Sequence, residues 1–184
     1  MPPRQTSDLP NIWLLSDERN DAALEDALAR LPQRSALVFR HYHLSLAKRR
    51  ARFAVLAAKA RGHGHAVIVS GAPTLALKWG ADGVYGPPAA LGSSEQLLRI
   101  ATTHDLPELV AARRAGADAA MLSPVFATRS HDGARCLGPV RFRLLAAKAG
   151  LPVIALGGMN AARAKRLQWP RWAAIDGLAS PPTP

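Results

Sequence analysis

The chain has 184 residues, enough for one domain, and 48% of them are hydrophobic but only 5% aromatic, so alanine, leucine and valine must form its core. Lysine and arginine number 24 against 13 acidic residues, a net charge of +11, but no aromatic platform is interleaved with them, which argues against a nucleic-acid partner. A single cysteine (Cys136), an N-terminus without a signal-peptide core and the lack of any apolar run of about 18 residues favour a cytoplasmic protein that does not enter a membrane.

Short apolar runs alternate with alanine-rich helical segments along the whole chain. Four of the helical segments carry lysine or arginine in their last turn and then meet a glycine, at Gly62, Gly80, Gly116 and Gly150. Glycine can adopt the left-handed conformation that closes a helix, and the cations suit the negative end of the helix dipole. Strands are predicted near residues 12–16, 36–40, 66–70, 83–86, 99–103, 119–123, 152–156 and 173–176.

Helices are predicted between these strands, beginning near Asp21, Leu46, Pro73, Ser93, Leu106, Pro139 and Asn160. This strict alternation predicts an α/β fold, and it favours a compact (β/α)8 TIM barrel over the open doubly wound sheet that takes the same pattern. We expect residues 1–184 to form a single domain, with 1–10 and 179–184 as tails. Only "LASPPTP" follows the last strand, so the eighth helix is expected to be missing or reduced. A second copy of the chain, in a homodimer, is a candidate to cover that gap.

Polar residues gather where the predicted strands end, which is the face of such a barrel that carries the chemistry. The strand interiors are by contrast almost entirely alanine, valine, isoleucine and leucine. This separation predicts a ligand site at that end. The polar residues there are Ser16, Asp17, Arg40, His41, Tyr42, His43, Ser70, Tyr85, Thr102, Thr103, His104, Thr128, Ser130, His131 and Asp176.

The clearest local motif is "ALGGMNAARAKRL", in which Gly157 and Gly158 follow a strand and a helix begins at Asn160. Backbone N–H groups at a glycine pair, next to a helix N-terminus, favour phosphate binding. The loops after strands seven and eight form the common phosphate site of this fold, which adds Asp176 and Gly177 to the candidates. The alternative is a tight turn in which Asn160 is an N-cap.

Two further side chains are candidates for ligand chemistry. His104 lies at a strand end, and the pKa of a histidine suits proton transfer near neutral pH, although a turn or capping role is the alternative. Arg40 ends a buried strand, where an arginine is costly unless it contacts a ligand or a carboxylate such as Asp17. The triplets "HYH" at 41–43 and "HGH" at 63–65 have no nearby cysteine or paired carboxylate, so no metal site is predicted.

The segment "THDLPELVAARRAGADAAMLSPVFATRSHDG", followed by "LGPVRFRLLAAKAGLPVIALGGM", resembles the thiamine phosphate synthase and TenI family. In that family a histidine begins the helix after strand five, and the motifs GAD, G-P-V-F-x-T-x-(T/S)-K and P-V-(I/V)-A-(I/L)-G-G-(I/M) follow. "KWGADGVYGP" is similar to the family's fourth strand and "IWLLSD" to its first. The resemblance covers nearly the whole chain, is most specific over residues 100–160, and implies a (β/α)8 barrel that holds a thiazole phosphate.

The resemblance also implies a set of binding residues. Thr128 and Ser130 match the two hydroxyls that line the thiazole and pyrophosphate site, whereas His131 replaces a family lysine and Asp176 a family serine. The expected substrate-binding residues are Arg40, Thr102, Thr128, Ser130 and His131. The expected phosphate-binding residues are Gly157, Gly158, Asp176 and Gly177.

Two activities occur in the family. The synthase joins a pyrimidine diphosphate to thiazole phosphate, with magnesium held by carboxylates. Here Ser70 and Gly71 replace the Asn-Asp pair after strand three, and "GPPAA" replaces the aspartate beyond strand four, so both magnesium-binding carboxylates are absent at the matching positions. The TenI branch also loses this site but keeps the histidine that matches His104. Its activity is thiazole tautomerisation, which needs an acid–base group and no metal cofactor.

We therefore expect a thiamine-biosynthesis protein that binds thiazole phosphate and tautomerises it, with His104 as the catalytic residue. The expected partner is a small phosphorylated thiazole or pyrimidine, and magnesium is required only if the chain is a synthase. A synthase in which Asp17, Tyr42 and His131 take over the lost contacts is one alternative. A catalytically inactive binding or regulatory barrel is another.

Overall fold

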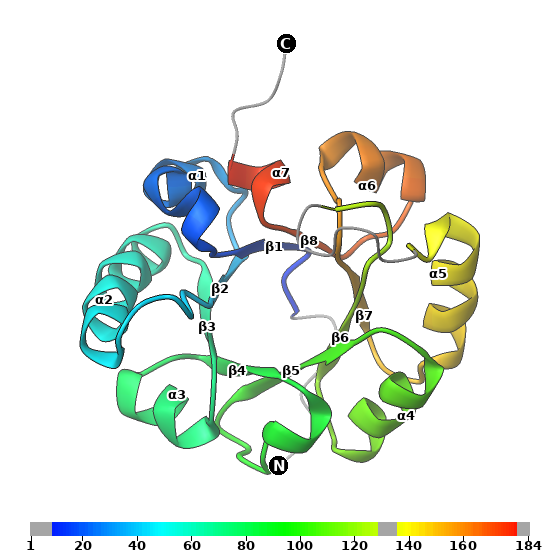
Figure 1. Ribbon diagram of the computed structural model, residues 1–184, viewed down its shortest axis with the longest axis horizontal. Helices are drawn as coiled ribbons and strands as arrows, with labels where there is room; N and C mark the ends of the chain where they lie inside the picture. Colours follow the sequence, from blue (N-terminus) through cyan, green and yellow to red (C-terminus); the bar gives the residue numbers. More distant parts are fainter. Residues whose placement is uncertain (1–8, 129–135, 180–184) are drawn as a thin grey trace.

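The computed structural model describes residues 9–128 and 136–179. Its strands are all parallel and close into a barrel in sequence order, with the last strand paired to the first (Figure 1). This closure confirms the (β/α)8 prediction and rejects the open sheet. The strands are β1 (Ile12–Leu15), β2 (Ala36–Phe39), β3 (Ala66–Ser70), β4 (Gly83–Gly86), β5 (Leu98–Thr103), β6 (Ala119–Leu122), β7 (Val153–Ala155) and β8 (Trp172–Ala174).

The helices surround the barrel as an outer ring (Figure 1). They are α1 (Leu24–Arg30), α2 (Leu46–Gly62), α3 (Pro73–Trp79), α4 (Leu106–Arg114), α5 (Gly138–Lys148), α6 (Ala161–Leu167) and α7 (Asp176–Ala179), with the 3₁₀ helices η2 (Glu18–Ala23) and η3 (Pro88–Ala90). None of the helices in the described part of the chain combines the length and the apolar character that a membrane span requires.

Side chains of the strands alternate between two hydrophobic layers. In β1, Trp13 and Leu15 lie in the cluster that fills the barrel, whereas Leu14 lies in the larger cluster between the barrel and the helices. All three are fully buried. Strands buried on both faces read as continuous apolar runs, because neither face meets water. This is why the sequence locates the strands well.

The predicted helix near Ser93 is wrong. Between β4 and β5 the chain forms only η3 and then a turn at Gly92, which has a φ of +62°. Residues 93–97 are all that separate Gly92 from the first residue of β5, which is too short a segment for two turns of α-helix. The loop passes close to α3, since a Cβ at Gly92 would lie 2.9 Å from Pro73 Cγ.

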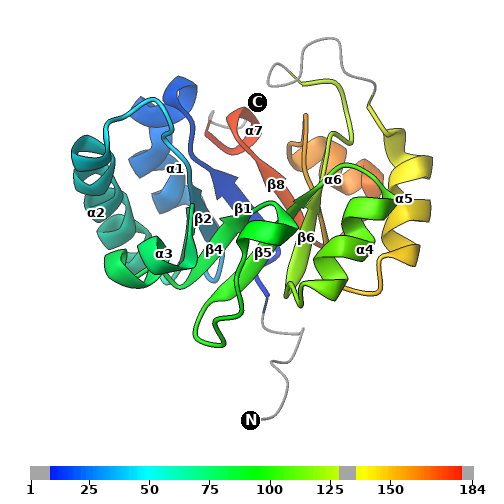
Figure 2. The same ribbon diagram turned by 60° about the horizontal axis from the view of Figure 1, so that its bottom comes forward.

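The eighth helix is present but reduced to the four residues of α7. It begins at Asp176, the position at which the last strand was expected to end. In Figure 2, α7 stands at the same end of the barrel as the chain that follows β6. Ala179 is buried, and its carbonyl accepts a hydrogen bond from Arg30 Nη2 at 3.1 Å. Most of the two predicted tails lies outside the described residues; Leu9 and Pro10, which are described, are buried.

Candidate active site

A pocket opens at the end of the barrel where β6, β7 and β8 finish. Most of its wall is backbone and small side chains rather than charged groups, and one arginine from the end of β2 reaches it. The residues that line it are Arg40, Ser123, Pro124, Thr128, Leu156, Gly157, Gly158, Met159, Ala174, Ile175, Asp176 and Gly177. The pocket therefore brings together the predicted glycine turn, the residues after β8 and two of the predicted substrate-binding side chains.

The Gly157–Gly158 turn can be built only with glycine. Their φ angles are +95° and +60°, in the region that favours glycine. A Cβ at Gly157 would lie 2.6 Å from Pro124 Cα, and one at Gly158 would lie 2.4 Å from the Ala127 carbonyl oxygen. The turn is thus pressed against the chain that follows β6, which fixes two walls of the pocket relative to each other.

An arginine lies next to this turn. Arg163, in the first turn of α6, donates from Nη1 to the Gly158 carbonyl, and its guanidinium lies 5.2 Å from the centre of the Phe126 ring. Asn160 caps the same helix, since its side-chain oxygen accepts from Arg163 N at 2.9 Å. Asn160 is therefore an N-cap, which was the alternative interpretation of this motif in the sequence. The Arg163 guanidinium also places a positive charge next to the glycine turn.

The residues after β8 form a further part of the wall, next to the glycine turn. A Cβ at Gly177 would lie 2.1 Å from the Met159 carbonyl oxygen, so this position also tolerates only glycine. Asp176 is half-exposed, and its nearest cation is Arg19, whose Nη1 lies 3.7 Å from Asp176 Oδ2. A carboxylate thus lines a pocket that was expected to hold phosphate.

Arg40 both pairs with a carboxylate and faces the pocket. Its Nη2 lies 2.6 Å from Asp17 Oδ2, and its side chain is 17% exposed. Its Nε is buried and has no hydrogen-bond partner among the described residues. The two interpretations of Arg40 are therefore compatible, because one edge of the guanidinium binds Asp17 and the pocket-lining side chain retains an unused donor.

Asp17 is held by several groups at once. Its Oδ1 accepts from Arg19 Nε at 2.9 Å, and its backbone N–H donates to Asn20 Oδ1 at 2.8 Å, which forms a capping box at the start of η2. Partial burial alone would raise the pKa of Asp17, but the hydrogen bonds from Arg19 and the charges of Arg19 and Arg40 outweigh it and lower that pKa. Asp17 is therefore ionised at neutral pH.

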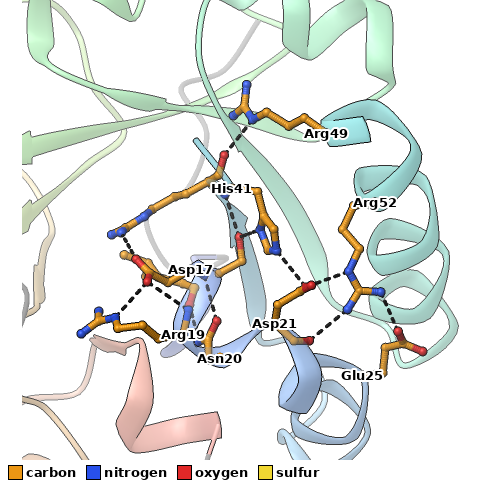
Figure 3. A network of polar contacts seen from close by, with 11 residues as sticks. Asp17, Arg19, Asn20, Asp21, Glu25, His41, Arg49 and Arg52 are labelled. Atoms are coloured by element: carbon orange, nitrogen blue, oxygen red, sulfur yellow. Dashed lines mark hydrogen bonds and ion pairs between the residues drawn. The ribbon is translucent and has the colours of Figure 1, made fainter. Parts of the chain in front are cut away.

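A second polar network runs through the ends of β1 and β2 (Figure 3). His41 has no exposed side-chain surface, and it contacts Ser16 Oγ through Nδ1 and Asp21 Oδ1 through Nε2, both at 2.8 Å. Ser16 Oγ also accepts from Arg40 N at 2.8 Å, and Arg52 Nε donates to Asp21 Oδ1 at 2.8 Å. With Nε2–H donated to the carboxylate, Nδ1 accepts the serine hydroxyl and every group in the network has a partner.

Burial sets the ionisation of this network. It lowers the pKa of His41, although the hydrogen bond and charge of Asp21 oppose it. Asp21 has a lowered pKa because hydrogen bonds from Arg52 and His41 outweigh the effect of its own partial burial. Ser16 is fully buried, so this serine–histidine–aspartate arrangement cannot present its hydroxyl to a substrate and is structural.

Arg49 joins the ends of β2 and β3. Its Nε donates to the Arg40 carbonyl at 2.7 Å and its Nη2 to the Ser70 carbonyl at 2.6 Å. The guanidinium also lies 5.5–5.7 Å from the ring centres of Phe39, Tyr42 and Trp79. Beside it, Tyr42 Oη and Ser70 Oγ are 2.7 Å apart. The polar groups at this part of the rim are therefore bonded to one another.

A family model described as thiamine monophosphate synthase matches residues 13–179. The chain belongs to the thiamine monophosphate synthase family. It is 35% identical over 120 residues to the bifunctional thiamine biosynthesis protein ThiM/ThiE of Symbiobacterium thermophilum, a match that spans 56% of this chain and 23% of that protein. It is 33% identical over 127 residues to the thiamine-phosphate synthase of Chloroflexus aurantiacus, spanning 65% of this chain and 57% of that enzyme. The chain thus covers less than two thirds of the length of either relative.

Solved structures agree on the fold. The thiamine phosphate pyrophosphorylase of Pyrococcus furiosus superposes with a TM-score of 0.79 at 23% identity, covering 95% of this chain and 90% of that one. FabK of Thermotoga maritima superposes with a TM-score of 0.71 at 16% identity, covering 95% and 61%. At such identities these likenesses establish the barrel and nothing about its chemistry.

The residues that the family resemblance selected are not all at the pocket. Among the described residues, Arg40 and Thr128 line it, whereas Thr102 and His104 do not. Thr102 lies two residues beyond Ile100, which is in the barrel-filling cluster, so it shares the inward face of β5. Ser130 and His131 lie outside the described residues, and their roles stay predictions.

His104 is exposed at the end of β5 and contacts Glu108 in α4. Its Nδ1 lies 2.9 Å from Glu108 Oε2, and its backbone N–H donates to the same oxygen at 2.7 Å. The preceding residue, Thr103, accepts a hydrogen bond at its carbonyl from the N–H of Ser123, which lines the pocket. His104 therefore stands on the strand next to the pocket wall.

The family's magnesium does not fit the residues at the ends of β3 and β4. Ser70 Oγ, the side-chain donor there, is already bonded to Tyr42 Oη and to the Tyr85 carbonyl. Across the described ranges, no group of three or more histidine, cysteine, aspartate or glutamate side chains could hold a metal ion. Asp17 and Asp176, the carboxylates nearest the pocket, face arginines instead.

Two arginines beside the pocket were not predicted from the sequence: Arg19, which pairs with Asp176, and Arg163, which donates to the Gly158 carbonyl. Arg19 lies within the start of η2, and Arg163 looks like one of many arginines in alanine-rich helices. Nothing in the local pattern distinguishes them. Only the partners that they meet in the folded chain do so.

Proposed function

We propose that this chain binds thiazole phosphate in the pocket at the ends of β6–β8 and tautomerises its ring by proton transfer through His104. The observation that best supports one bound substrate rather than two is that the two sides of the barrel rim differ. The pocket lies on the β6–β8 side, whereas Tyr42, Ser70 and Arg49 on the β2–β3 side are bonded to one another. A second, diphosphate-bearing substrate would have to break those bonds.

The arrangement of His104 supports the acid–base role. If the proton on Nδ1 is donated to Glu108, Nε2 is left as the basic nitrogen. A ring proton removed at one carbon and returned at another needs one such group and no metal, so the proposal includes no cofactor.

Replacement of His104 tests the mechanism. His104→Ala should lower the turnover of the thiazole tautomer by about 100-fold or more, the usual contribution of a general acid–base group, while the dissociation constant for thiazole phosphate changes less than about threefold. His43→Ala, an exposed histidine at the end of β2, is the matched control and should leave both values unchanged. Unchanged turnover in His104→Ala would refute the mechanism.

A thiamine phosphate synthase is the second candidate, since the relative that bears that name is 33% identical to the chain over 127 residues. The test is turnover of pyrimidine diphosphate and thiazole phosphate with and without magnesium, measured through the fluorescent oxidation product of thiamine phosphate. Magnesium-dependent product would overturn the proposal in favour of the synthase. If folded protein binds thiazole phosphate but catalyses neither reaction, the chain is an inactive binding barrel.

A cytoplasmic location and a homodimer complete the proposal. The support for the homodimer is the short α7, which has four residues in the part of the chain that the structure describes. Sedimentation equilibrium at micromolar concentration should give about twice the 19.6 kDa mass of the chain. A monomer under these conditions would remove this part of the proposal and leave the reaction untouched.

A further inference from the structure

A row of alternating charges crosses the rim beside the pocket, from β2 to α7. It consists of Arg40, Asp17, Arg19 and Asp176. The first two contacts are short, at 2.6 and 2.9 Å, and the last, between Arg19 Nη1 and Asp176 Oδ2, is 3.7 Å. Both ends of the row, Arg40 and Asp176, line the pocket.

The inner part of the row is rigid. Asp17 is fixed by the capping box and binds one arginine through each carboxylate oxygen. Figure 3 shows the Arg19 guanidinium at the Asp17 carboxylate, where Arg19 Nε donates to Oδ1. Arg40 Nη2 donates to the other oxygen, Oδ2. Since its Nε is held by Asp17, Arg19 is restricted to the side of the rim where Asp176 begins α7.

The outer contact is weak by comparison. A distance of 3.7 Å is too long for a hydrogen bond, and the two side chains are 36% and 50% exposed. Ion pairs of this kind contribute little to stability. Its consequence is electrostatic, because it places a positive charge beside Asp176, the one carboxylate among the described residues that line the pocket.

The balance of charge at the pocket depends on this contact. Among the described residues that line the pocket, pair with its lining residues or adjoin its glycine turn, the cations are Arg40, Arg19 and Arg163, and the carboxylates are Asp17 and Asp176. Three positive against two negative charges leave one net positive charge. Without Arg19 the sum is zero, and a phosphate would meet Asp176 with no compensation.

We propose that the Arg19–Asp176 pair determines the charge of the ligand that this pocket accepts: Arg19 neutralises Asp176, and this neutralisation lets the pocket hold a phosphate monoester. Arg19 is thus a specificity-determining residue that acts through Asp176. The Asp176 carboxylate lowers the affinity for phosphate and does not bind the phosphate itself. The inference rests on the proposed function for the identity of the ligand, but the role of the pair can be measured with inorganic phosphate alone.

Four proteins test the pair: the wild type, Arg19→Gln, Asp176→Asn and the double variant. Each is titrated calorimetrically, at low ionic strength, with thiazole phosphate, with the same thiazole alcohol lacking its phosphate, and with inorganic phosphate. For the two phosphate-bearing ligands, Asp176→Asn should bind about tenfold tighter and Arg19→Gln about tenfold weaker, as expected for one charge a few ångströms away in a partly solvated site. The double variant should return to the wild-type value. The alcohol should bind all four equally.

Two further variants separate charge from structure. Arg19→Lys retains the charge but not the Nε contact with Asp17, and it should bind phosphate nearly as the wild type does. Arg61→Gln is the matched control, because Arg61 forms a similarly long pair with Asp82, at 3.9 Å, but does not line the pocket. Arg61→Gln should change the dissociation constant for phosphate less than about twofold. That small change is the effect of a distant charge at low ionic strength.

The outcomes separate the two claims. If thiazole phosphate binds all four proteins equally, the role of the pair is wrong and the proposed function stands. If inorganic phosphate follows the expected order but neither thiazole ligand binds, the pair has its role and the proposed function is wrong. A double variant as weak as Arg19→Gln would show that Arg19 binds phosphate itself, and the absence of phosphate binding in all four would also overturn the inference.

Discussion

The two sides of the barrel rim use their polar residues in opposite ways. At the ends of β1–β3, side chains bond to each other through Ser16, His41 and Asp21, and Arg49 bonds to the carbonyls of both β2 and β3. At the ends of β6–β8, backbone and glycines surround an open pocket. Polar residues at a barrel rim therefore do not by themselves mark a site; what matters is whether their hydrogen bonds are already used within the protein.

The pocket side should be the more sensitive to a single methyl group. Gly177→Ala places a Cβ 2.1 Å from the Met159 carbonyl oxygen, so α7 or the turn after β7 must move. We expect the free energy of unfolding to fall by about 2–3 kcal/mol, the scale of overpacking, and thiazole phosphate binding to be lost. Urea unfolding and calorimetric titration measure the two effects.

Gly62→Ala is the control for this substitution. Gly62 ends α2, and no atom lies within 4 Å of a Cβ built there. Alanine should therefore fit and raise the free energy of unfolding by up to about 1 kcal/mol, since it reduces the freedom of the unfolded chain. If Gly177→Ala binds the ligand and unfolds as the wild type does, the residues after β8 do not pack closely against the Met159 carbonyl.

The contacts of Arg49 at the ends of β2 and β3 should affect stability without affecting the ligand. Arg49→Ala removes two hydrogen bonds to carbonyls and contacts with three rings. We expect a loss of about 2–3 kcal/mol in the free energy of unfolding and a change of less than about threefold in thiazole phosphate affinity. Arg50→Ala, at the exposed neighbouring position of α2, should change stability by less than about 0.5 kcal/mol. If Arg49→Ala loses thiazole phosphate binding but keeps its stability, the ends of β2 and β3 bind the ligand. The proposed difference between the two sides of the rim would then be wrong.

The smallest expected effect is a pH dependence of stability. Burial lowers the pKa of His41 in the folded protein, so the unfolded chain binds a proton there more readily. Stability contributed by neutral His41 is complete above its unfolded pKa of about 6.5 and is lost as the pH falls through the lower folded value. Urea unfolding between pH 8 and pH 5 should therefore shift to lower midpoints.

His41→Asn should remove this shift. Asparagine tolerates the left-handed backbone that His41 adopts, with a φ of +40°. His43→Asn, at an exposed position, should retain the pH dependence of the wild type. An identical slope in His41→Asn would mean that other groups titrate in this range. Asp17 and Asp21 do not interfere, since their lowered pKa values place their own loss of stability in a more acidic window.

The sequence by itself determined the barrel, the positions of its strands and the family. The signals for these are local: apolar runs, alanine-rich helices, and glycines such as Gly80 and Gly116, both of which have positive φ angles. Local patterns of this kind can be recognised in a single sequence. The same local signals failed at Ser93, because β5 begins at Leu98 and leaves too few residues for a helix. They also located the glycine turn of the pocket, where Gly157 and Gly158 follow β7 directly.

Only the tertiary structure decided which polar residues face a ligand and which face each other. Arg40 meets Asp17 across 23 positions, and Asn20 donates to the Ile175 carbonyl across 155. Arg19 lies beside Asp176 because barrel closure pairs β8 with β1, which brings the residues that follow β1 next to those that follow β8. Such partners have no fixed spacing in the sequence, so neither the charge of the pocket nor the role of its arginines can be obtained from local pattern alone.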